Sequence, residues 1–183
     1  NDPTRLIPLL LGILYARGLV NWPKPRPLKP WQPYFFYGGL VIGVLAIASP
    51  VDVASDDLFL MHMIQHLLIV MVAPPLILLG APTTPILRGL PTRARKGIVA
   101  PLMRSHGVRA FYGWITIPFV VWIAFTVNMW AWHFYGDAYE LAIRNLGLHI
   151  FQHWTFIATA TLLWWSAVAA QQVQGKQRCR PAE

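Results

Sequence analysis

Long apolar stretches alternate with short polar segments along this chain, and the pattern predicts membrane-spanning helices. A helix needs about 20 mostly apolar residues to cross a bilayer. Windows close to this length fall at residues 4–20, 31–49, 57–80, 111–134 and 146–170. We therefore expect an all-α protein, a single transmembrane bundle of about five helices over residues 1–170. A polar, basic tail should follow at residues 171–183.

Prolines interrupt this pattern at two places. The proline-rich segment at residues 21–30 cannot continue a helix and favours an extended linker between the first two windows. Pro74 and Pro75 lie in the second half of the third window. They should kink that helix or end its regular hydrogen bonding early.

The composition excludes an ordinary soluble domain. Hydrophobic residues make up 56% of the chain and charged residues 12%, whereas charged residues usually contribute about 25% of a soluble domain. Cys179 is the single cysteine, so the chain cannot form an internal disulfide. The sequence begins at Asn1 without an initiator Met and shows no recognisable secretory leader, so residues upstream are expected to be missing.

Basic residues are distributed unevenly between the predicted connections. Thirteen of the 15 Lys and Arg residues fall at the end of the first window and in the connection after it, in the connection after the third window, and in the tail. The other connections contain Arg144 as their one basic residue, together with Asp52, Asp56, Asp57, Asp137 and Glu140. The positive-inside rule then places the N-terminus outside and the C-terminus in the cytoplasm of a bacterial inner membrane. We interpret the basic residues as topology signals and expect no nucleic-acid binding.

A histidine motif occurs twice in the chain, as His62-Met-Ile-Gln-His66 and as His149-Ile-Phe-Gln-His153. Residues four apart project from one face of a helix, so each copy presents two imidazoles. Histidine inside a membrane is costly and usually functional. The predicted topology brings both pairs and His133 to the outer leaflet, which indicates a metal site. His106 falls in a cytoplasmic connection and is expected to be a solvated loop residue.

Copper fits this set of side chains best, because imidazole suits copper and thioether sulfur selects its reduced form. Met63 and Met129 are the candidate thioether ligands. Gln65 and Gln152 could orient imidazoles or could simply make hydrogen bonds between helices. A His-Glu-x-x-His protease is excluded because Met63 and Ile150 occupy the position of the required Glu.

Two iron-based alternatives are weaker. A di-iron oxygenase would need more histidines, usually in adjacent pairs. Histidines four apart are separated by about 6 Å along a helix, which is too little for two stacked haems. One haem remains open as an alternative occupant.

Several segments in order, covering nearly the whole chain, resemble the CtaG-type membrane family of cytochrome c oxidase assembly factors. They are Ser49-Pro-Val-Asp52, His62-Met-Ile-Gln-His66, Ala73-Pro-Pro-Leu-Ile-Leu-Leu-Gly80, Trp132-His133-Phe-Tyr135, His149-Ile-Phe-Gln-His153 and Trp164-Trp165. The resemblance implies a role in supplying copper to the catalytic centre of the oxidase. It also implies that the metal carriers are His62, His66, His133, His149 and His153, with Asp52 as the acidic residue of the Ser-Pro-x-Asp turn.

We therefore expect a metallochaperone and not an enzyme. Its partners would be the lipid bilayer and subunits of cytochrome c oxidase or of another respiratory complex, and it could act as a homodimer. The alternative is an accessory structural subunit of such a complex, with histidines that bond between helices. A proton or ion path is weakened because the predicted spans show no buried carboxylate.

Overall fold

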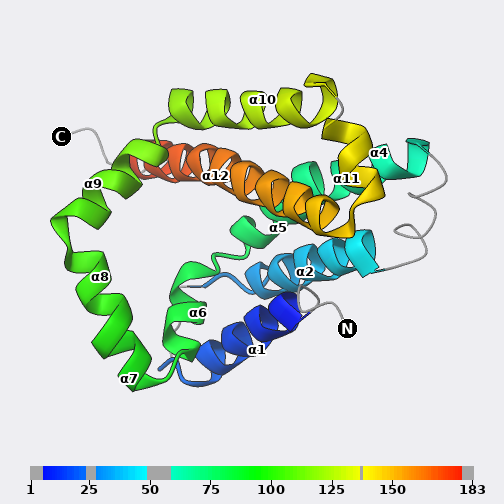
Figure 1. Ribbon diagram of the computed structural model, residues 1–183. Coiled ribbons are helices and arrows are strands. Elements are labelled where there is room, and N and C mark those ends of the chain that lie inside the picture. The colour runs from blue at the N-terminus through cyan, green and yellow to red at the C-terminus, as the bar shows by residue number, and fades with distance from the viewer. Residues whose placement is uncertain (1–5, 24–27, 49–58, 137, 179–183) are drawn as a thin grey trace. The chain divides into compact units, whose positions relative to one another are not determined.

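The computed structural model describes residues 6–23, 28–48, 59–136 and 138–178, and every regular element in these ranges is a helix (Figure 1). The all-α prediction is confirmed for this part of the chain. The chain divides into two compact units, Asn1–Gly113 and Trp114–Glu183, which are described one at a time. A single transmembrane domain stays a prediction.

The first unit contains the first three predicted windows as helices and adds a run of short helices after them. Its elements are α1 (Leu6–Val20), α2 (Gln32–Ala48), α4 (Phe59–Leu67), η2 (Leu68–Val72), α5 (Ala73–Leu79), α6 (Thr83–Gly89), α7 (Thr92–Ala94), η3 (Arg95–Val99), α8 (Ala100–Arg104) and most of α9 (His106–Ile115). The sequence pattern predicted no helix between residues 81 and 110. These helices are short and lack a long apolar run, so hydropathy did not reveal them.

The prolines of the third window cause a π-helical turn. Proline has no N–H, and its ring clashes with the carbonyl four residues earlier in a regular α-helix. In η2, directly before Pro74 and Pro75, the Ala73 N–H bonds instead to the carbonyl of Leu68, five residues back. The predicted loss of regular hydrogen bonding is confirmed, although the helix continues through α5 to Leu79.

Aromatic packing forms the core of the first unit. The ring of Tyr15 on α1 stacks on Phe36 of α2, with centroids 3.9 Å apart. Its hydroxyl donates a hydrogen bond to the carbonyl of Gly80 (2.8 Å). Leu40 completes the buried cluster. The hydrogen bond satisfies the polar end of a buried tyrosine, and it ties α1 to the end of α5.

Helices α1 and α6 approach each other closely at two glycines. A Cβ atom added at Gly18 would meet the carbonyl oxygen of Pro85, and one added at Gly89 would meet the carbonyl oxygen of Leu14. Small residues allow two backbones to approach in this way, as they do between membrane helices.

Substitution of Gly18 by alanine should therefore force the two backbones apart. We expect Gly18→Ala to reduce the free energy of unfolding by about 1–3 kcal/mol, the usual cost of overpacking. Gly97→Ala is the control, since nothing lies within 4 Å of the added Cβ; it should be neutral or stabilising by up to about 1 kcal/mol. Thermal denaturation in one detergent compares the two variants, and equal melting temperatures would contradict the close contact.

The second unit consists of α10 (Pro118–Phe134), α11 (Ala138–Arg144) and α12 (Leu146–Arg178). Helices α10 and α12 lie side by side (Figure 1). Asn128 Nδ2 donates to Thr159 Oγ1 (3.4 Å). Trp132 Nε1 donates to Thr155 Oγ1 (3.0 Å). These polar contacts fix α10 against α12 in the way that hydrogen bonds join helices within membranes.

The fourth predicted window is not one continuous helix. Helix α9 already begins at His106, and the helical structure is interrupted at Thr116 and Ile117 before α10 begins. Ile117 is extended, with ψ of 124°, because the residue before a proline is disfavoured in the α-helical region. The window at 111–134 therefore joined the end of one helix to the whole of the next.

The described helices suggest membrane association. The helix at Leu60–Leu79 is long and apolar enough to cross a bilayer, and α9 with α10 would add a second span if the broken pair counts as one. Helices α1 and α2 are apolar but shorter. Helix α12 is long enough at 33 residues, but no stretch of its described residues is apolar enough to count as a candidate span.

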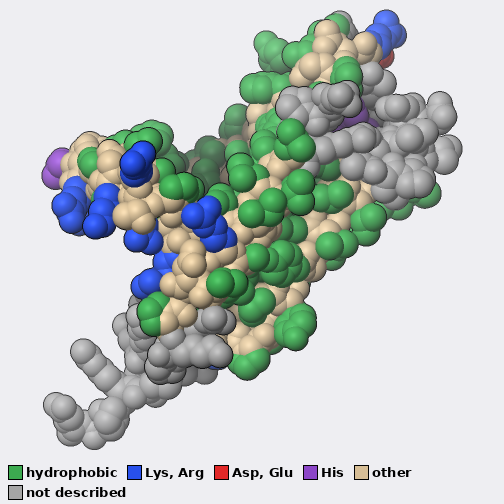
Figure 2. Space-filling view, turned by 90° about the horizontal axis from the view of Figure 1, so that it is seen from below, with side chains coloured by type: hydrophobic (Ala, Val, Ile, Leu, Met, Phe, Trp, Pro, Cys, Tyr) green, Lys and Arg blue, Asp and Glu red, His purple; other side chains and the backbone are tan. Residues whose placement is uncertain are grey.

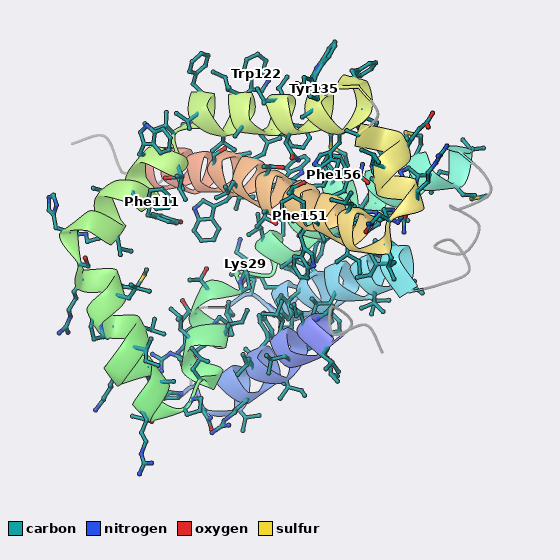
Figure 3. All side chains as sticks on the ribbon, viewed as in Figure 1. Lys29, Phe111, Trp122, Tyr135, Phe151 and Phe156 are labelled. Carbon is teal, nitrogen blue, oxygen red and sulfur yellow. The ribbon has the colours of Figure 1, made fainter. Side chains whose placement is uncertain are left out.

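Exposed apolar side chains also suggest membrane association. They are numerous on the face shown in Figure 2. Trp122, 56% exposed, lies on the face of α10 that points away from α12 (Figure 3). Soluble monomers rarely expose large continuous apolar patches, so surfaces of this kind are suited to contact with lipid.

Candidate metal centre

The first histidine pair lies on α4 in the first unit. His62 and His66 are one helical turn apart and both are buried. Their ring centroids are 4.3 Å apart, and one ligand nitrogen of each lies within 4.8 Å of the other. The predicted presentation of two imidazoles on one helix face is therefore confirmed for this copy of the motif.

Gln65 anchors this pair to the neighbouring helix. Its Nε2 donates a hydrogen bond to the carbonyl of Ala46 near the end of α2 (2.9 Å), and its side chain is fully buried. A bond between helices was one of the two roles considered for this residue. The bond ties the C-terminal part of α4 to α2, one turn before the π-helical turn η2.

The second histidine pair lies on α12 in the second unit. His149 and His153 have ring centroids 4.4 Å apart, nearly the same separation as in the first pair. His153 is buried, whereas His149 is partly buried with an enclosed Nε2 atom. Both copies of the motif therefore form the same structure, two imidazoles one turn apart in a largely apolar helix.

Asn145 starts the helix that carries the second pair. Its Oδ1 atom accepts hydrogen bonds from the N–H groups of Gly147 (2.9 Å) and Leu148 (3.2 Å). Its backbone carbonyl accepts from the N–H of His149 (2.9 Å). This is N-capping, which asparagine performs well. The cap was not singled out from the sequence, although an Asn directly before an apolar periodic segment is a helix-start signal.

Loss of this cap should loosen the first turn of α12. We expect Asn145→Ala to cost about 0.5–2 kcal/mol and Asn145→Asp to cost much less, because aspartate can also cap. Hydrogen exchange at residues 147–149 would show faster exchange in the alanine variant alone. Equal protection in both variants would contradict the role of the cap.

Gln152 differs from its counterpart Gln65. Its side chain is fully buried, and neither its Nε2 nor its Oε1 atom has a hydrogen-bond partner among the described residues. A buried primary amide normally uses its donors and acceptor, and leaving them unused costs about 1–3 kcal/mol. Such an amide, directly before His153, is suited to bonding an imidazole N–H once the ring is oriented by a metal.

His133 lies near the end of α10 and is partly buried. Its Nδ1 donates to the carbonyl of Met129 (2.9 Å), which leaves the lone pair of the neutral ring on Nε2. Its ring lies 5.8 Å from that of Phe156, a buried residue of α12 (Figure 3). Among the described residues of the second unit, His133 does not form a three-residue cluster with His149 and His153. Its place as a ligand stays a prediction.

The remaining candidates are only partly placed by the structure. Met63 and Met129 are partly buried, and a thioether role for either one stays a prediction. Asp52 lies outside the described residues. His106 was expected in a loop, but it is the first residue of α9, and it is exposed. It therefore serves as a control histidine outside the two pairs.

Sequence reasoning missed the polar contacts that position the second pair. Asn128 bonds to Thr159 and Trp132 bonds to Thr155. Both threonines lie on α12 after His153. A signal for one of them was present, because Asn128 is a polar residue inside a long apolar stretch.

The donor set of both units is dominated by neutral imidazole, a ligand that copper, zinc, iron and nickel accept.

Comparison with known proteins gives one family. A family model described as cytochrome c oxidase caa3 assembly factor (Caa3_CtaG) matches residues 13–181. No curated protein and no solved structure matches the chain. The matched range includes both histidine pairs, His133 and both glutamines.

Proposed function

Because the chain belongs to the cytochrome c oxidase caa3 assembly factor family, we propose that it binds copper through its histidine pairs and assists the delivery of the metal to the oxidase. The oxidase or its subunits would be the partner, and copper would be cargo. The family match supports assembly as the process, and the histidine pairs support the chemistry.

The observation that carries the proposal is the pair of imidazoles that each motif forms, both rings buried in the first pair and His149 partly buried in the second. The ring centroids are 4.3 Å apart in the first pair and 4.4 Å apart in the second. Burial of polar rings in apolar helices costs free energy, and a bound metal would offset that cost. Copper is favoured because imidazole suits it and the nearby Met63 could select its reduced form.

We propose a five-span topology that places this chemistry at the outer leaflet. The N-terminus would lie outside and the C-terminus in the cytoplasm of a bacterial inner membrane. The uneven distribution of basic residues supports this orientation. Both histidine pairs and His133 would then lie at similar depth near the outer surface, where a helix of the client oxidase could approach laterally.

Transfer of a metal fits the site better than catalysis does. Neither α4 nor α12 contains an acidic residue, so the histidine pairs have no carboxylate on their own helices to act as general acid or base. The neutral imidazoles of a pair can hold a cation and release it to other ligands, and this transfer needs no general acid or base.

Delivery is tested in cells that make the oxidase without this chain. We expect the isolated oxidase to retain haem and to contain less copper than normal. The wild-type chain and His106→Ala should restore the copper, whereas the double variant His66→Ala with His153→Ala should not. An oxidase with full copper in the absence of this chain would contradict the proposed delivery.

A second candidate is a structural subunit of a respiratory complex. Hydrogen bonds between helices favour it, namely that of Gln65 with Ala46 and that of Trp132 with Thr155. Such a subunit would co-purify with an oxidase in stoichiometric amount and contain no metal. A haem-binding protein would instead show a Soret band after purification, so one preparation distinguishes the three candidates.

A further inference from the structure

A basic, amphipathic segment joins the two units of the chain. We name residues 92–115 the basic arm; it consists of α7, η3, α8 and α9. It contains five Lys and Arg residues, and the sequence has no Asp or Glu between residues 58 and 136. The basic residues are Arg93, Arg95, Lys96, Arg104 and Arg109. The arm therefore presents an uncompensated positive charge.

Most apolar residues of helix α9 lie opposite its basic residue, with Trp114 between the two faces. One face contains His106, Arg109, Ala110 and Gly113, at the spacing of a single helix face. The opposite face contains Val108, Phe111, Tyr112 and Ile115 at the same spacing. Phe111, labelled on α9 in Figure 3, is 61% exposed, and Tyr112 is 43% exposed.

The preceding helices of the arm repeat this combination. Ile98, Leu102 and Met103 are large apolar residues, each more than half exposed. Lys96 and Arg104 are exposed in the same helices. Figure 2 shows Lys and Arg side chains gathered with apolar side chains on this part of the surface. The arm thus combines exposed apolar side chains with exposed positive charge along its length.

The length and charge of the arm argue against a spanning helix. Helix α9 has 10 residues, and Pro118 forces the chain to break before α10 begins. A short helix with apolar and basic faces is suited to lie in the plane of a membrane surface, with the apolar face in the boundary between headgroups and acyl chains. Basic residues next to a membrane attract anionic lipids.

We propose that the basic arm lies on the cytoplasmic membrane surface and recognises the headgroups of anionic phospholipids. The charge of the arm selects this occupant, since a zwitterionic surface offers no complementary net charge. The inference rests on the proposed membrane location and orientation. It does not depend on copper, because the arm contains neither histidine pair.

The test measures the depth of spin labels on the arm of the full chain. Cysteines are introduced one at a time at Ile98, Phe111 and Ala110 in a Cys179→Ser background. Each labelled protein is placed in nanodiscs of phosphatidylcholine alone or of phosphatidylcholine mixed with phosphatidylglycerol. Collision with oxygen and with a water-soluble nickel chelate then reports whether each label lies in lipid or in water.

In the anionic discs, labels at Ile98 and Phe111 should lie about 5–10 Å into the lipid, while the label at Ala110 on the polar face should remain in water. In phosphatidylcholine alone the two apolar positions should become more accessible to water. Neutralisation of Lys96, Arg104 and Arg109 to Gln should remove this difference, because the charges that attract anionic headgroups are lost. The control, Arg17→Gln with Arg144→Gln, removes two exposed basic residues outside the arm, one of them paired with Glu140, and should leave the difference intact.

Three results would overturn the proposal. In the first, labels at Ile98 and Phe111 are as accessible to water as the label at Ala110 in anionic discs. In the second, they are immersed equally in both lipid compositions, which would mean that the apolar face alone inserts. In the third, the control variant loses the lipid dependence as fully as the arm variant does. The copper measurements use variants of the histidine pairs and not of the basic arm. Failure of one proposal can therefore be distinguished from failure of the other.

Discussion

Replacement of both His66 and His153 by alanine should abolish copper binding under conditions in which the wild-type chain retains the metal after loading and washing. Each substitution removes one buried imidazole from a pair and leaves a single ring of that pair on its helix. The loss of affinity should exceed the roughly 10–100-fold that removal of an outer-shell partner costs. Competition with a chelator of reduced copper measures it in detergent.

Two controls separate loss of ligands from loss of fold. His106→Ala removes an exposed histidine outside the pairs and should bind copper as the wild-type chain does. His66→Gln with His153→Gln keeps polar side chains at the buried positions but provides no imidazole, so it should also lose copper while it keeps its helical circular dichroism. Wild-type affinity in both double variants would show that the pairs are not the ligands.

Replacement of Gln152 by leucine should weaken copper binding about 10–100-fold, as removal of an outer-shell partner does, while leaving the metal-free protein at least as stable. The amide is fully buried and makes no hydrogen bond with the described residues. An apolar side chain of similar volume then removes an unsatisfied polar group, which is neutral or stabilising. This combination of results would show that Gln152 lowers the stability of the metal-free protein and contributes to metal binding.

Gln65→Leu is the matched control, since Gln65 occupies the same place in the first copy of the motif. Here the substitution removes the hydrogen bond to the carbonyl of Ala46 and leaves that acceptor in a buried site. We expect it to reduce the free energy of unfolding by about 1–3 kcal/mol. Thermal unfolding of both metal-free variants makes the comparison, and equal destabilisation by the two substitutions would contradict the difference between the glutamines.

The helical class and the approximate positions of the main apolar helical segments could be predicted from hydropathy. The prolines at 74 and 75 correctly predicted irregular hydrogen bonding, because their missing N–H groups and ring clash act locally. Pro118 acts in the same local way, yet its effect on Ile117 was overlooked within a continuous apolar window. The short helices between residues 83 and 104 mix apolar and basic residues. The mean hydropathy of a window long enough for a membrane span is therefore low there, and such a window does not detect these helices.

The histidine pairs could be predicted because a spacing of four residues fixes one helix face. The two glutamines could not be distinguished, since both precede the second histidine of their motif. Their difference depends on a contact distant in sequence, between Gln65 and the end of α2, and no local pattern contains that contact. The cap at Asn145 was local and recognisable, whereas the bond between Trp132 and Thr155 needed the packing of α10 against α12.

The central claim is that imidazoles of the two motifs hold copper. X-ray absorption at the copper edge of the loaded, washed protein tests it most directly. We predict a nitrogen shell with the multiple scattering of imidazole, present in the wild-type chain and in His106→Ala and absent from His66→Ala with His153→Ala. A protein that retains no copper, or one that holds copper through sulfur or oxygen ligands alone, would contradict the claim.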